Sequence, residues 1–126
     1  MATSDRTQTV FPATFARLKA MLAPHAPTLV VETDTPTAYT LHTPATPTSP
    51  KEEFFCSVQI KKNYVSLYLM PIYCYPDLAA DLPERLRKRQ QGKSCFNFTA
   101  LDDATLADLA ALTAAAHDRD RRERAP

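Results

Sequence analysis

Residues 53–70 read Glu-Phe-Phe-Cys-Ser-Val-Gln-Ile-Lys-Lys-Asn-Tyr-Val-Ser-Leu-Tyr-Leu-Met, and this stretch decides the fold. Apolar and polar side chains alternate along two runs, with Lys61-Lys62-Asn63 between them. Because side chains of a strand alternate between two faces, the pattern predicts two strands, each with one dry face and one mixed face. The short polar connection favours an antiparallel hairpin, since Asn tolerates a left-handed backbone.

The alternation assigns the side chains of this hairpin to two faces. The expected dry face carries Phe54, Cys56, Val58, Ile60, Val65, Leu67 and Leu69. The expected mixed face carries Phe55, Ser57, Gln59, Tyr64, Ser66 and Tyr68. Tyrosines, hydroxyls and an amide on one face make it the first place to look for a binding function.

The remaining chain predicts helices and strands around this hairpin. In chain order they are a helix at 9–23, strands at 29–32 and 37–42, the hairpin, a helix at 83–91, a strand at 94–99 and a helix at 102–117. Phe11, Phe15, Leu18 and Leu22 form one stripe on the first helix, which is typical of a helix packed on a core. Gly92 follows the 83–91 segment where a left-handed helix C-cap is favoured, and Asp102 is the expected N-cap of the last helix.

These elements predict an α+β fold, a two-layer sandwich with a single, mainly antiparallel sheet of about five strands. The N- and C-terminal helices are expected on one face, since strands with one dry face need one layer of helices. The expected domain organisation is a flexible N-terminus at 1–8, a single α+β domain at 9–117 and a charged flexible tail at 118–126.

Composition narrows the class of protein. The 126 residues are 44% hydrophobic and 23% charged with a net charge of +1, which is typical of a globular protein and argues against nucleic acid as the partner. No segment reads as a signal peptide or membrane span, so a cytoplasmic protein without a membrane partner is expected. A single glycine excludes glycine-rich phosphate loops, and no cofactor is predicted.

Two stretches resemble a known family. Asn63-Tyr-Val-Ser-Leu-Tyr-Leu-Met-Pro, followed by Gln91-Gly-Lys-Ser-Cys-Phe-Asn-Phe, is similar to the YdhG-like domain-of-unknown-function family. Its members share a Lys-Asn hairpin turn, a strand ending in Tyr-x-x-Pro, and a Gly-Lys-Ser/Thr-x-x-x-Phe strand before the last helix. One branch is described as bacterial frataxin-like iron chaperones, so the resemblance implies a frataxin-like sheet covered by the terminal helices.

The iron-binding feature of that branch is not repeated here. The resemblance implies that iron would bind to an acidic ridge along the first helix and the first strand. Residues 9–23, however, contain no Asp or Glu. Hard iron needs several convergent oxygens, so only weak binding is expected. The carboxylates to test first are Glu32, Asp34, Asp102 and Asp103.

The mixed face supplies the candidate ligand-binding residues. These are Tyr64, Tyr68, Ser57, Gln59, Lys61, Lys93 and Asn97. Aromatic planes with hydrogen-bonding groups and a positive rim suit an anionic or planar ligand. The expected function is therefore a non-enzymatic binding protein for a small anionic or metal-associated ligand, with no catalytic residue and no metal site assigned. An ordinary solvated sheet face is the alternative interpretation.

Other functions stay open at this point. Tyr64 and Tyr68 could stack bases on a nucleic-acid-binding sheet, the open face could form a homodimer, or Cys74 or Cys95 could act in a small enzyme. His25, His42 and His117 read as surface residues, because none is next to a plausible nucleophile.

Overall fold

The computed structural model describes residues 10–47 and 50–124, and the predicted flexible segment 1–8 lies outside them. Within those residues six strands form one antiparallel sheet in the order β1-β2-β3-β4-β6-β5. The strands are β1 Val30–Thr35, β2 Ala38–Thr43, β3 Glu53–Ile60, β4 Val65–Leu69, β5 Gln90–Gln91 and β6 Cys95–Phe98. The predicted hairpin is confirmed as β3 and β4, which lie at the centre of the sheet.

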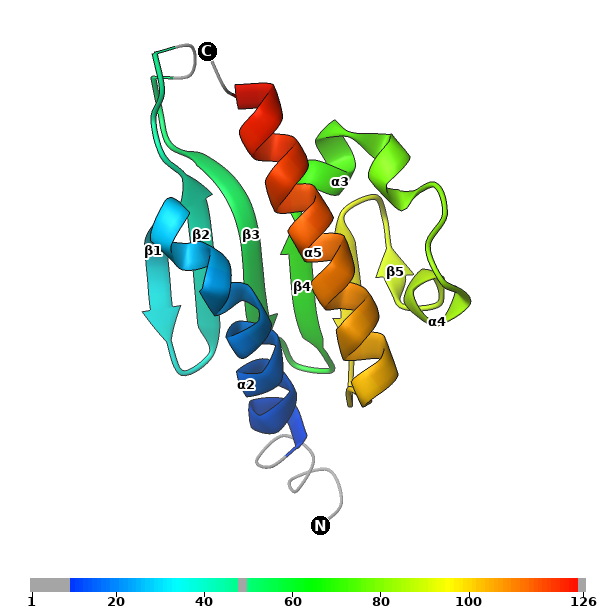
Figure 1. Ribbon diagram of the computed structural model, residues 1–126. Helices are drawn as coiled ribbons and strands as arrows, with labels where there is room; N and C mark the ends of the chain where they lie inside the picture. The colour runs from blue at the N-terminus through cyan, green and yellow to red at the C-terminus, as the bar shows by residue number, and fades with distance from the viewer. Residues whose placement is uncertain (1–9, 48–49, 125–126) are drawn as a thin grey trace.

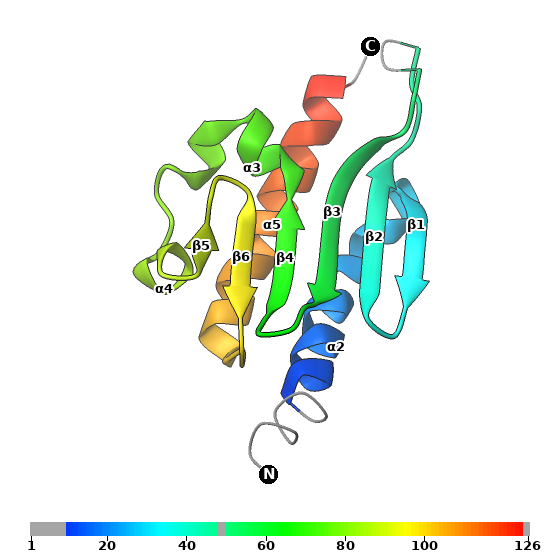
Figure 2. The same cartoon turned by 180° about the vertical axis from the view of Figure 1, so that it is seen from behind.

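Two long helices cover one face of this sheet. They are α2 Phe11–Leu22 and α5 Asp103–Arg124, which contact each other in front of β3 and β4 (Figure 1). Seen from behind, the sheet itself is in front and both helices lie beyond it (Figure 2). The predicted two-layer α+β architecture is therefore confirmed. Four short helical segments complete the described chain: η2 Ala23–Thr28, α3 Met70–Cys74, η3 Pro76–Ala79 and α4 Glu84–Arg87.

The core lies between the helices and the inner face of the sheet. Val58, Leu67 and Phe96 are aligned across three neighbouring strands and are 0% exposed. The helices cover them with Phe11, Phe15, Leu18, Leu22, Leu109, Leu112 and Ala116. Asp102 caps α5 as predicted, since its carboxylate accepts a hydrogen bond from the Thr105 N–H at 2.7 Å.

A bulge in β3 reverses the predicted faces of Phe54 and Phe55. Leu41 of β2 pairs with Cys56, but the next residue, His42, pairs with Phe54, so Phe55 is the additional residue. Phe55 is buried, and its ring lies 5.9 Å from that of His117 on α5, while Phe54 packs on His42. The expected order, Phe54 inside and Phe55 outside, is wrong, because a bulge breaks the period-two alternation.

The segment predicted as a helix at 83–91 is helical only in α4. Gln90 and Gln91 pair with β6, and the Asn97 N–H donates to the Arg89 carbonyl at 2.9 Å. Gly92 has φ +73° in the turn between β5 and β6 rather than at a helix end. The prediction was correct that a left-handed residue is needed there and wrong about the element that it ends.

Helix α5 continues to Arg124, so the predicted charged tail is helical over residues 118–124. Pairs four residues apart join Arg119 to Glu123, Arg122 to Asp118 and Arg124 to Asp120. Arg119 also pairs with Asp77 of η3, and Arg124 pairs with Glu53 of β3. Ion pairs of this segment therefore attach the end of α5 to η3 and β3. None of the helices in the described part of the chain has the length and apolar content needed to span a membrane.

Candidate functional site

The strand register places most of the candidate side chains on the sheet face away from the helices. Ser57 pairs with Tyr68 and Gln59 with Ser66 between β3 and β4, and Ser66 pairs with Asn97 of β6. Alternation then puts these residues on the face opposite Val58 and Leu67, which is the face seen in Figure 2. This face is called the open face below.

The small polar residues of the open face bond to one another. The Ser57 hydroxyl lies 2.8 Å from the Thr40 hydroxyl and accepts a hydrogen bond from Gln59 Nε2 at 3.1 Å. The Ser66 hydroxyl donates to Asn97 Oδ1 at 2.7 Å. Ser57 and Ser66 are only 1% and 3% exposed. These groups form a hydrogen-bonded layer of small polar side chains. Contact with a ligand is therefore expected from the lysine and the tyrosines.

Lys61 lies in the turn between β3 and β4. Its ammonium lies 5.8 Å from the centroid of the Tyr68 ring, within the range of a cation–π contact. Tyr64, which shares the face of Ser66 and Tyr68 by alternation, is 44% exposed. One end of the open face thus combines a cation with two aromatic rings.

Cys95 lies beside the same group. Burial raises the pKa of its thiol, while a hydrogen bond with Ser66, the charge of Lys61 and a hydrogen bond with Tyr68 act in the opposite direction. Burial also raises the pKa of Cys56, to about 12. A raised pKa keeps a thiol protonated and weakly nucleophilic, which gives no support to an enzyme acting through Cys95. Cys74 is exposed on α3.

Lys93 does not join the Lys61–Tyr68 group. Its ammonium lies 5.6 Å from the centroid of the Tyr73 ring, and both residues line a cavity of about 460 Å³ between the β5–β6 turn and the α3–η3 segment. The seven candidate residues therefore occupy two places, with six on or near the open face and Lys93 at the end of the sheet.

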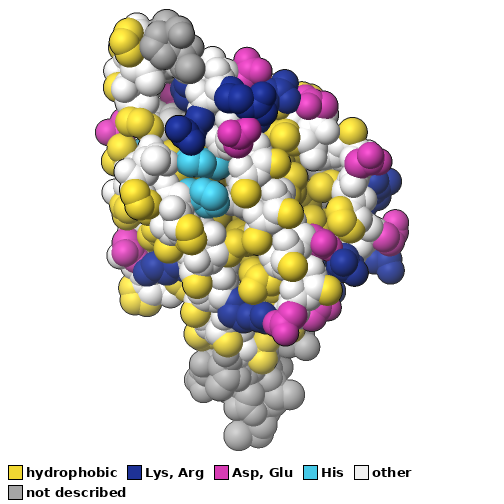
Figure 3. All heavy atoms as spheres, viewed as in Figure 1, with side chains coloured by type: hydrophobic (Ala, Val, Ile, Leu, Met, Phe, Trp, Pro, Cys, Tyr) yellow, Lys and Arg dark blue, Asp and Glu magenta, His cyan; other side chains and the backbone are white. Residues whose placement is uncertain are grey.

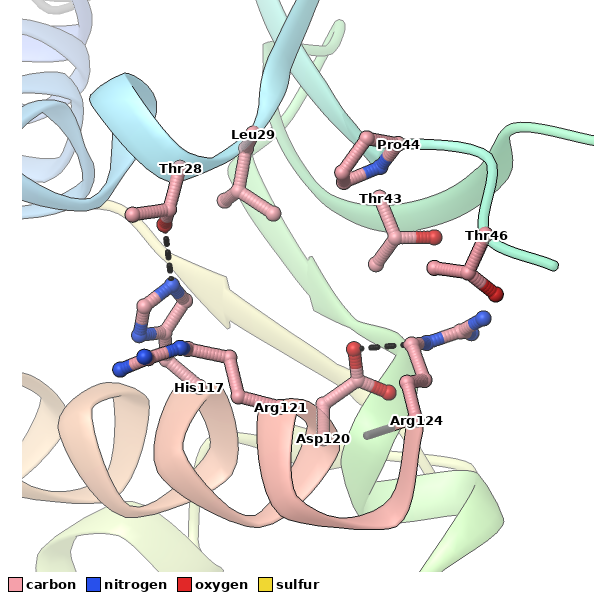
Figure 4. Close-up of a pocket in the computed structure, with 9 residues that line it drawn as sticks. All are labelled: Thr28, Leu29, Thr43, Pro44, Thr46, His117, Asp120, Arg121 and Arg124. Carbon is pink, nitrogen blue, oxygen red and sulfur yellow. Dashed lines mark hydrogen bonds and ion pairs between the residues drawn. The ribbon is translucent and has the colours of Figure 1, made fainter. Parts of the chain in front are cut away.

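A second cavity, on the helix side, was not predicted from the sequence. It has a volume of about 260 Å³ and is lined by Thr28, Leu29, Thr43, Pro44, Thr46, His117, Asp120, Arg121 and Arg124 (Figure 4). Its α5 residues lie at positions i, i+3, i+4 and i+7, a spacing that shares one helix face. That spacing is the sequence signal that could have singled out His117, once the helix was known to continue past it.

Three of the four carboxylates considered for iron have an ion-pair or helix-capping partner within the protein. Asp34 pairs with Lys19 at 2.6 Å, Asp103 pairs with Arg17, and Asp102 caps α5. Among the described residues there is no group of three or more His, Cys, Asp or Glu side chains suited to hold a metal ion.

Comparison with protein families, with characterised proteins and with solved structures gave no match for this chain. The resemblance to the YdhG-like family therefore stays a prediction. Only the geometry described above bears on function.

Proposed function

We propose that this protein is a non-enzymatic binding protein that holds a small anionic or metal-associated ligand on the open face, beside Lys61, Tyr64 and Tyr68. The observation that carries the proposal is the Lys61 ammonium, which lies 5.8 Å from the centroid of the Tyr68 ring, in the same hairpin as the exposed Tyr64. A planar anion would stack on an aromatic ring and place its charge against the ammonium. Membership of the YdhG-like family and a cytoplasmic location belong to the same proposal.

The hydrogen-bonded layer of small polar side chains supports ligand binding on this face. Because the Ser57 and Ser66 hydroxyls and Asn97 Oδ1 already have partners, a flat ligand covers these atoms without leaving them unsatisfied. Covering them with a ring therefore carries a small desolvation cost. Their bonds also hold neighbouring strands in register under Tyr68, so the aromatic surface is preorganised.

A nucleic-acid strand is the second candidate occupant of this surface. Tyr64 and Tyr68 lie four residues apart on the same face, and successive bases of a single strand stack on rings arranged along a sheet. The net charge of +1 gives no long-range attraction to phosphates. A mononucleotide is therefore expected to suit the surface better than a long strand.

The test is a titration of the full chain with adenosine monophosphate, followed by amide chemical shifts. Shifts are expected at residues 57–68 and 95–97, and Tyr68→Ala should weaken binding by about 1–3 kcal/mol through loss of stacking. Lys61→Gln should weaken it as well, whereas Lys62→Gln removes an exposed lysine from the same turn and should have little effect. An oligothymidine of eight nucleotides tests the second candidate.

Two results would contradict the proposal. One is binding that is unchanged by Tyr68→Ala in a variant shown to be folded. The other is a set of shifts confined to α2 and α5. An oligothymidine that binds much more tightly than the mononucleotide would favour the nucleic-acid alternative.

A further inference from the structure

The cavity lined by His117 and Arg121 lies on the other side of the molecule from the open face. Its walls are the end of η2 with the start of β1, the end of β2 with the loop after it, and one face of α5 (Figure 4). Histidine and basic side chains are adjacent on this helix-covered surface (Figure 3). Ligand pockets are commonly about 300–1,000 Å³. A cavity of about 260 Å³ is therefore suited to a small molecule.

The hydrogen bonds of His117 fix its protonation pattern. The Thr28 hydroxyl donates its hydrogen to the His25 carbonyl at 3.1 Å, so its oxygen is an acceptor for the ring nitrogen 2.7 Å away. His117 Nε2 consequently carries a hydrogen and donates to Thr28. The lone pair is left on Nδ1, the nitrogen at which a second proton would bind.

The two arginines of the cavity have different roles. Arg124 is held by two carboxylates, Asp120 at 2.8 Å and Glu53 at 2.7 Å, so its charge is already paired within the protein. Arg121 is exposed, and its charge is close enough to His117 to lower the pKa of the imidazole. In Figure 4 its guanidinium lies beside the His117 ring. Arg121 is therefore the cation available to a ligand.

The remaining walls indicate which anion fits. Leu29 and Pro44 supply apolar surface, while the hydroxyl of Thr43 is directed to the Glu53 carbonyl. Inorganic phosphate would leave that apolar surface without a partner. A ligand whose apolar part packs on Leu29 and Pro44 and whose carboxylate is directed toward Arg121 matches both the apolar and the charged walls.

We propose that this cavity binds a small organic carboxylate, with Arg121 and protonated His117 as its anion partners. This site is separate from the open face and does not depend on the function proposed for that face. As the carboxylate binds, His117 takes up one proton from the solvent at Nδ1, and the resulting imidazolium donates a hydrogen bond to the carboxylate. Binding is then coupled to proton uptake.

The groups around His117 set the direction of the pH dependence. Burial, His25 from η2 and Arg121 from α5 lower its pKa from 6.5, while Asp120 and Asp118 raise it and are outweighed. A bound carboxylate would raise the pKa again. Affinity is therefore expected to be constant at high pH and to increase as pH falls from the pKa of the complex toward that of the free protein.

The experiment titrates the full chain with benzoate, a probe with an apolar ring and one carboxylate, while His117 ring and amide resonances are followed. Shifts are expected at residues 28–29, 43–46 and 117–124. Benzamide, its neutral counterpart of the same shape, should bind about tenfold or more weakly, because charge-assisted hydrogen bonds are lost. Binding of benzoate should strengthen as pH falls toward and below 6.5, with a rise in the His117 pKa on saturation.

Two arginine variants locate the effect. Arg121→Gln should weaken the binding of benzoate by about tenfold or more. Arg122→Gln, which removes an exposed arginine paired with Asp118, should leave the affinity for benzoate unchanged. Tyr68→Ala should also leave it unchanged, which separates this site from the open face. Equal binding of benzamide, equal loss in the two arginine variants, or shifts on the open face alone would overturn the proposal. Benzoate affinity that is independent of pH would overturn the role of His117.

Discussion

Phe54 and Phe55 are neighbours in β3 with opposite surroundings. Phe55 is 1% exposed and contacts the His117 ring, while Phe54 is half-buried against the edge of His42 on the open face. Both environments are created by one additional residue in β3. The bulge brings Phe55 next to the histidine of the α5 cavity, so a single register shift links the sheet to the proposed carboxylate site.

Truncation of these two rings should therefore have unequal effects. Phe55→Ala is expected to reduce the free energy of unfolding by about 3–5 kcal/mol, because it leaves a cavity in a packed core. Phe54→Ala should cost about 1–2 kcal/mol, because its ring is only partly buried. Denaturant unfolding of both variants measures the difference. Equal losses, or a larger loss for Phe54→Ala, would mean that β3 has no bulge in solution.

At the scale of elements, the last two turns of α5 connect three parts of the fold. Arg119 pairs with Asp77 of η3, and its guanidinium lies 4.8 Å from the Tyr75 ring. Arg124 pairs with Glu53 of β3, and Asp120 is 7% exposed beneath it. The Arg124–Asp120 pair is partly buried and contributes more than the exposed pairs, since solvent screens it less.

Removal of residues 118–126 should therefore destabilise the protein. We expect a loss of roughly 1–3 kcal/mol in the free energy of unfolding, because the contacts to η3 and β3 disappear together. The control removes residues 125–126 alone, which leaves every described contact in place. Thermal and denaturant unfolding measure both. A full deletion as stable as the control would show that these ion pairs contribute nothing in solution.

At the scale of the whole molecule, burial of His25 and His117 makes the stability of the folded protein depend on pH. Their rings are 4.6 Å apart, one from η2 and one from α5, and burial lowers the pKa of each from 6.5. The unfolded chain then binds protons more readily than the folded one below pH 6.5. Stability is consequently lost as pH falls from 6.5 through the folded pKa values.

A pH series of denaturant unfolding should show this decline. Stability should be nearly constant from about pH 8 to pH 7 and should decrease toward pH 5. His117→Gln keeps a donor for Thr28 and removes the titration, so its decline should be smaller. A separate decline is expected below pH 3.8, where Asp77 and Asp102, whose pKa values are lowered by Arg119 and by the Thr105 cap, become protonated. Parallel pH profiles for the parent and His117→Gln would contradict the assignment to His117.

The amino-acid sequence by itself determined the central hairpin, the apolar stripe of the first helix and the layer order. Val58, Leu67 and Phe96 were correctly predicted to lie inside, because the period of a strand is local and a single dry face needs one covering layer. The Asp102 cap was also predictable, since its partner, Thr105, is three residues away. The same alternation put Ser57, Gln59 and Asn97 on the open face.

Only the tertiary structure decided the bulge in β3, the pairing of β5 with β6 and the helical end of α5. It also decided the cavity, where Thr28 and His117 meet across 89 residues of sequence. Such contacts leave no local period, because the two side chains meet only when helices and sheet pack together. The physical reason is that short-range patterns select the face of an element, while burial against distant elements selects its length, its register and the charges that surround it.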